Sequence, residues 1–210
     1  MFAPGRSYVR QCAPRAETGR VALLVWATVA AVALLIVGLI IGAPLLVASG
    51  HFAPAAPVYN LFGYVCHQLP ERSLHLEGHK LAVCSRCTGL YAGFALSTLF
   101  YPLARSLRRV DTPRLLWLLL ALVPFATDWS LGYFELWANT HLSRFLTGAL
   151  LSSVAAFYIV PGLVDLGQSI RRRRSFARTE QPSRQAADAA QVLPVAPSAP
   201  SDYSSPSSRI

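Results

Sequence analysis

Three cysteines and two histidines lie within one short stretch of this sequence and could bind a single metal ion. Cys66 and His67 are adjacent, His79 follows, and Cys84 and Cys87 form a CxxC pair, in the pattern C-H-x11-H-x4-C-x2-C. Three thiolates and one imidazole nitrogen are a donor set that tetrahedral zinc prefers. The spacing therefore predicts a site for zinc or a similar transition metal, with ligands drawn from these five residues.

The same cysteines also suit two other kinds of chemistry. Cys84 and Cys87 fall on one face of a predicted helix, at its N-terminus and beside Arg86, which favours the thiolate over the thiol. A thiolate serves disulfide exchange as well as metal binding, so a thiol–disulfide oxidoreductase using this pair is an alternative. A structural disulfide is another alternative, although three cysteines would leave one unpaired. Cys12 lies far away along the chain and is expected to be an ordinary thiol.

The segments that must position these groups are mostly apolar. The chain has 210 residues, of which 53% are hydrophobic and 14% are charged, and its mean hydropathy is +0.41. A soluble domain carries about a quarter charged residues, and a helix needs roughly 20 apolar residues to cross a bilayer. We predict an all-α integral membrane protein, a bundle of four transmembrane helices that contacts the lipid bilayer. The spans are expected at about 21–49, 87–104, 115–134 and 142–164.

The positive charges predict the orientation of these spans. Arginines precede the first span, surround the loop between the second and third, and follow the fourth, whereas the alternate segments hold few. The positive-inside rule then places both termini in the cytoplasm and the Cys/His loop outside. The predicted domains are a basic cytoplasmic segment (1–20), the membrane domain (21–165) and a cytoplasmic tail (166–210).

The tail is basic at first and then rich in Pro, Ser and Ala, so we expect it to be disordered. Its arginine run, Arg171 to Arg174, is expected to contact anionic lipid headgroups. Because topology already accounts for the positive charge, no nucleic-acid partner is expected.

Two charged residues fall within the predicted spans. Charged groups are costly in a bilayer and usually face a partner, so we expect Asp128 and Arg144 to meet between the third and fourth spans. They could form a structural ion pair or act in catalysis, with Asp128 as a base or hydrogen-bond acceptor. Arg72, Arg86 and Arg144 could also bind an anionic group such as a lipid phosphate.

Two stripes of small residues predict close helix packing. The second span carries Ser85, Gly89, Gly93 and Ser97 at intervals of four, and the fourth carries Gly148, Ser152 and Ala156. Small residues at this spacing let two membrane helices approach closely.

The segment CHQLPERSLHLEGHKLAVCSRCTGLYAG, residues 66–93, resembles the signature of a known family. That family consists of predicted bacterial multipass membrane proteins with the domain of unknown function 2085, and its pattern is CHQ-x-P-x-RS-x4-GH-x3-VC-[AS]-RCTG-x-Y-x-G. The resemblance extends over residues 57–165, although Trp129 stands where the family has glycine. It implies a multipass protein of the bacterial cytoplasmic membrane and a common site; the residues are Cys66, His67, Arg72, His79, Cys84, Arg86, Cys87, Asp128 and Arg144.

The leading functional hypothesis is an integral membrane protein with a zinc-type site at its outer face, with a role as a membrane-embedded enzyme left open. The first alternative is the thiol–disulfide oxidoreductase. The second is a transporter or scaffold, which with only four spans would be expected to form a homo-oligomer.

Overall fold

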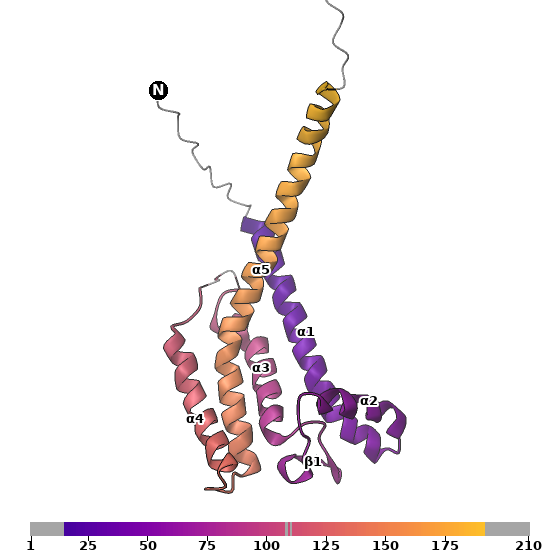
Figure 1. The fold of residues 1–210 in the computed structure, drawn as a ribbon, viewed down its shortest axis with the longest axis vertical. Coiled ribbons are helices and arrows are strands. Elements are labelled where there is room, and N and C mark those ends of the chain that lie inside the picture. The colour runs from indigo at the N-terminus through magenta and orange to yellow at the C-terminus, as the bar shows by residue number, and fades with distance from the viewer. Residues whose placement is uncertain (1–14, 108, 110, 192–210) are drawn as a thin grey trace, which may run out of the picture. The chain divides into compact units, whose positions relative to one another are not determined.

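The computed structural model describes residues 15–107, 109 and 111–191 (Figure 1). The chain forms two compact units, the first ending at Ser169 and the second beginning at Ile170. The elements are α1 (Arg15–Ala48), α2 (Phe52–Gly63), the 3-10 helix η1 (Pro70–Arg72), β1 (His75–Leu76), β2 (His79–Lys80), α3 (Ser85–Ala104), α4 (Leu115–Tyr133) and α5 (His141–Gln191).

Three helices of the described residues are long and apolar enough to cross a membrane. They cover Gly19–Ala48, Leu115–Tyr133 and His141–Arg174, and large apolar side chains such as those of Leu24, Trp117 and Val123 are exposed on their surfaces. Lipid is the solvent that accepts such surfaces. The predicted class, a mostly helical membrane protein, is confirmed.

The predicted span 87–104 forms a helix but is not among these three. It lies in α3, whose serines, threonines and glycines make it less apolar than α1 and α4. Four crossings are therefore not established by length and composition alone.

Close packing between α3 and α5 explains the small residues of α3 (Figure 1). A Cβ atom added to Gly89 would lie 2.1 Å from the carbonyl oxygen of Phe145, and one added to Gly93 would lie 2.5 Å from that of Ala149. The backbones can approach this closely only because these residues lack side chains. The close helix packing predicted from the small residues is confirmed, and the structure shows that the two stripes face each other.

The helix α3 also packs against α1. The indole nitrogen of Trp26 donates a hydrogen bond to the carbonyl oxygen of Thr98 at 2.7 Å. The side chains of Thr98 and Tyr101 are buried. The polar groups of α3 are thus largely enclosed by neighbouring helices.

The Cys/His loop packs against the end of α1 around its own small core. Ile40 of α1, Phe62 of α2 and Val83 just before α3 are buried together with Cys66. Between them, β1 and β2 form an antiparallel hairpin whose turn residues Glu77 and Gly78 have φ values of 51° and 75°. Positive φ at both central residues is the requirement of a two-residue hairpin turn, and glycine meets it without strain.

Three polar residues join the two ends of this loop. The Tyr59 hydroxyl donates to the carbonyl oxygen of Lys80 at 2.6 Å, and the Lys80 ammonium donates to that of Gln68 at 2.9 Å. The Gln68 amide donates back to the Tyr59 carbonyl oxygen at 2.7 Å. These bonds fix the approach of the chain to Cys66.

The predicted disorder of 166–210 is not what the structure shows for its first part. The helix α5 continues to Gln191, while residues 192–210 lie outside the described part of the chain. Residues 171–191 are rich in Arg, Ala and Gln, which have high helix propensity, so the low apolar content does not prevent a helix. Cys12 and the rest of residues 1–14 also lie outside the described residues.

Candidate metal centre and arginine cluster

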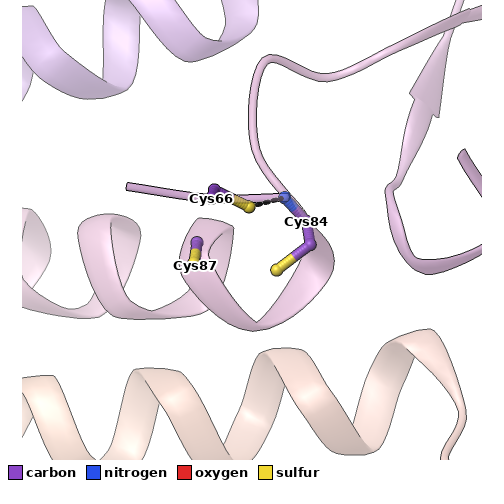
Figure 2. Close-up of side chains that lie close together, drawn as sticks. All are labelled: Cys66, Cys84 and Cys87. Atoms are coloured by element: carbon purple, nitrogen blue, oxygen red, sulfur yellow. Dashed lines mark hydrogen bonds between the residues drawn. The ribbon is translucent and has the colours of Figure 1, made fainter. Parts of the chain in front are cut away.

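Cys66, Cys84 and Cys87 form a compact cluster of sulfur atoms (Figure 2). Their three Sγ atoms all lie within 4.8 Å of one another, and all three residues are free of disulfides. Sulfurs that share one zinc ion at about 2.3 Å are a little under about 4 Å apart, so the cluster is close to the spacing that an ion requires. The three cysteines could bind a metal.

Each cysteine is positioned by a different local feature. Cys66 follows α2 and is buried in the core of the loop, with 7% of its surface exposed. Cys84 is the N-cap of α3, and Cys87 lies in the first turn of that helix. The backbone N–H of Cys84 donates a hydrogen bond to the Cys66 sulfur at 3.2 Å, which holds the loop against the helix (Figure 2).

The neighbouring sulfurs favour a thiolate at Cys84. Hydrogen bonding from the Cys66 side chain, and then from that of Cys87, lowers the pKa of the Cys84 thiol to about 2, against the opposing effect of burial. The backbone N–H groups at the start of α3 act in the same direction. The lowered pKa favours the thiolate at Cys84, which is the form that a metal ligand or an attacking sulfur must have.

The two predicted histidine ligands do not join this cluster. Among the described residues, the group of candidate metal ligands consists of the three cysteines alone. Cys66 points into the core of the loop and its neighbour His67 is exposed, while His79 is held in β2 by the pairing with β1. The folding of the loop thus brings the sulfurs together without the imidazoles.

A second cluster lies beside the cysteines, around Asp128. An Arg86 Nη atom donates to one carboxylate oxygen of Asp128 at 2.5 Å, and the Ser143 hydroxyl donates to the other at 2.8 Å. The side chain of Asp128 is 8% exposed and that of Arg86 is 19% exposed. Asn139 also donates to the Asp128 backbone carbonyl.

The predicted ion pair between Asp128 and Arg144 is not formed; Arg86 takes its place. In α5 it is Ser143, the residue before Arg144, that reaches the carboxylate. The guanidinium of Arg144 has no ion pair or hydrogen bond to the described residues, and its Nε is buried without a partner.

Ser85 connects these parts, although the sequence indicated only a packing role for it. Its hydroxyl donates to the carbonyl oxygen of Arg72 at 3.0 Å and lies 2.8 Å from Nδ1 of His141. The signal for this role was its position between Cys84 and Arg86. Ser143 and Asn139 had no comparable signal in the sequence.

Comparisons with known proteins agree with this architecture. The model of the family described as predicted membrane protein (DUF2085) matches residues 66–158. An uncharacterized protein of Methanocaldococcus jannaschii is 36% identical over 104 residues, which is 50% of this chain and 67% of that protein. An uncharacterized protein of Methanothermobacter thermautotrophicus is 37% identical over 89 residues, 41% of this chain and 77% of that protein. The chain belongs to the DUF2085 family.

No solved structure has a significant match to the chain. The match to the DUF2085 family begins at Cys66 and includes every residue of both clusters, while α1 and α2 precede it. Both relatives come from archaea, so the predicted location in a bacterial membrane does not follow from membership of the DUF2085 family.

Proposed function

We propose that this membrane protein binds zinc through Cys66, Cys84 and Cys87 and leaves the fourth coordination position open to a ligand that the protein does not supply. The observation that carries this proposal is the mutual approach of three sulfurs within 4.8 Å with no histidine among them. Structural zinc sites are closed by four protein ligands, whereas catalytic sites keep one position for water or substrate. The geometry therefore favours a site that acts on a ligand, as a membrane-embedded enzyme would.

The proposal is tested by metal analysis of the purified full-length protein together with a count of its thiols under non-reducing conditions. We expect about one zinc per chain, with three thiols protected until a chelator is added and Cys12 freely titratable. A metal-free protein with one disulfide would contradict the proposal.

That contrary result would support the thiol–disulfide oxidoreductase in place of the zinc protein. Two observations favour this second function: the sulfurs of Cys84 and Cys87 are neighbours, and the pKa of Cys84 is lowered. Cys66 would then be the third sulfur available for exchange.

We further propose that the chain crosses the membrane four times, with both termini in the cytoplasm and the cysteines at the outer face. The enclosure of α3 between α1 and α5 supports a fourth crossing, because its polar groups need not face lipid. Arg20 and Arg105 line one surface pocket, and Arg105 caps the end of α3 opposite to Cys84. Arg20 and Arg105 thus lie at the end of the helices away from the cysteines, and by the positive-inside rule this supports a cytoplasmic location for that end.

A pair of reporter fusions tests this orientation. A reporter that functions only in the cytoplasm should be active when it is joined after Arg174. A reporter that functions only outside the cell should be active when it is inserted in the hairpin turn at Glu77. The turn is exposed and tolerates insertion better than the helices. The reverse pattern of activity would place the cysteines on the reducing side and contradict the proposed orientation.

A further inference from the structure

Three arginines surround the first turn of α3, next to the cysteine cluster. Arg86 lies in that turn, and the hydroxyl of the preceding Ser85 bonds to the backbone of Arg72 at 3.0 Å and lies 2.8 Å from His141. His141 begins α5, one helical turn before Arg144. Three separate segments of the chain therefore bring arginines to one end of α3.

This arginine cluster has more positive charge than the protein neutralises. Asp128 pairs with Arg86, and the described residues contain no ion pair for Arg72 or Arg144. The Nε atoms of Arg86 and Arg144 are both buried without a hydrogen-bond partner. Burying an unpaired charge or an unsatisfied donor is costly. An excess of positive charge, with donors still free, is what an anion-binding site offers before its ligand arrives.

We propose that Arg72, Arg86 and Arg144 bind a phosphoryl group. The guanidinium group presents a planar fork of N–H donors that matches two phosphate oxygens at once. A phosphate monoester carries about −1.5 to −2 charges at neutral pH, which balances the excess on the cluster. The proposal rests on the arginines alone and goes beyond the metal site, although the two sites are neighbours.

Exposed aromatic side chains indicate the depth of this cluster in the bilayer. Four aromatic side chains are each about half exposed or more: Trp129 and Tyr133 at the end of α4, and Phe134 and Trp137 in the loop after it. Tryptophan and tyrosine collect at the level of the lipid headgroups. Because Asp128 precedes Trp129, the arginines lie at the depth of headgroup phosphates. The phosphoryl group can therefore belong to a lipid or to a free phosphate that enters from the water.

Binding measurements on the full-length protein test the proposal and separate the two sources. Inorganic phosphate is titrated by calorimetry into protein in a neutral detergent. Separately, the protein is placed in nanodiscs of phosphatidylcholine with or without phosphatidic acid, and the retained lipid is identified by native mass spectrometry. We expect binding in at least one arm, and a loss of at least about tenfold in affinity for Arg72→Gln and Arg144→Gln, since each removes charge-assisted hydrogen bonds.

Arg109→Gln is the matched control, because Arg109 is an exposed arginine in the loop after α3, at the other end of that helix. It should bind like the wild type. Binding of inorganic phosphate identifies a free anion as a sufficient ligand, and binding of phosphatidic acid alone identifies a lipid headgroup. If Arg144→Gln does not fold, the test is made with Arg72→Gln, because Arg72 is exposed.

The proposal is overturned if the wild type binds no inorganic phosphate and retains phosphatidic acid no better than phosphatidylcholine. It is also overturned if Arg109→Gln loses as much affinity as Arg72→Gln. Zinc is measured on the same samples. Unchanged zinc with lost phosphate binding supports an anion site that is separate from the metal site. Loss of both in Arg72→Gln would show damage to the loop instead and would also overturn the proposal. A wild type that contains no metal and still binds phosphate would contradict the proposed zinc site and leave the phosphoryl site supported.

Discussion

Replacing Cys84 with serine should remove the bound metal completely. A serine hydroxyl is not a thiolate, and the two sulfurs that remain, at Cys66 and Cys87, cannot hold zinc at a site that already lacks a fourth protein ligand. The hydrogen bond from the Cys84 backbone to the Cys66 sulfur would no longer be supported by a shared ion. We therefore expect the zinc content to fall from about one per chain to background, and the loop to be cleaved faster in limited proteolysis.

Three further variants serve as controls for this result. Cys12→Ser should keep the metal, because Cys12 is not part of the cluster. His67→Ala and His79→Ala should keep it as well, because neither imidazole joins the sulfurs. Full zinc content in Cys84→Ser would refute the metal site. Loss of zinc in one histidine variant would instead mean that a histidine closes the site, and the open position would be refuted.

Replacing Asp128 with asparagine should destabilise the protein strongly. Arg86 would keep its charge in a largely enclosed position, with two more arginines nearby and no carboxylate to balance them. Breaking a buried ion pair by removing one partner costs about 3–5 kcal/mol. We expect a loss of this size in the free energy of unfolding, measured by thermal or denaturant unfolding in detergent.

A double-mutant cycle shows which arginine is the partner of Asp128. Asp128→Asn combined with Arg86→Gln should cost clearly less than the two single losses added together, because the double variant buries neither charge. The same cycle with Arg144→Gln should be closer to additive, since the carboxylate bonds to Arg86 and Ser143. Strong coupling to Arg144 and none to Arg86 would contradict the observed pairing.

The position of Asp128 also shows what spacing along a chain cannot specify. The sequence indicated that an aspartate inside an apolar segment needs a partner, and the structure supplies one. Two arginines were available near the same end of the helices, Arg86 and Arg144. The choice between them depends on the rotation of each helix about its own axis, because one residue along α5 turns a side chain by about 100°. That rotation places Ser143, and not Arg144, against the carboxylate.

Several properties of this protein follow from the sequence by itself, because they depend on local composition or short spacing. The long apolar blocks determine a helical membrane protein, since a bilayer leaves the backbone few other ways to satisfy its hydrogen bonds. The spacing of Cys84 and Cys87 indicates that they lie together at the start of a helix, and the glycines at intervals of four indicate the face of that helix that packs closely against another. Each of these patterns lies within a single segment of the chain.

The tertiary structure alone decided the composition of the site. Cys66 reaches the CxxC pair because the hairpin and the core around Phe62 and Val83 turn the loop back onto α3, and the same path leaves His67 exposed. The approach of Arg72 and His141 to Ser85 depends on η1 and α5, which reach α3 from distant parts of the chain. Such contacts arise from the packing of segments tens of residues apart, and packing depends on the shapes of all the surrounding side chains. A motif therefore names the residue types of a site, and the fold selects which of them meet.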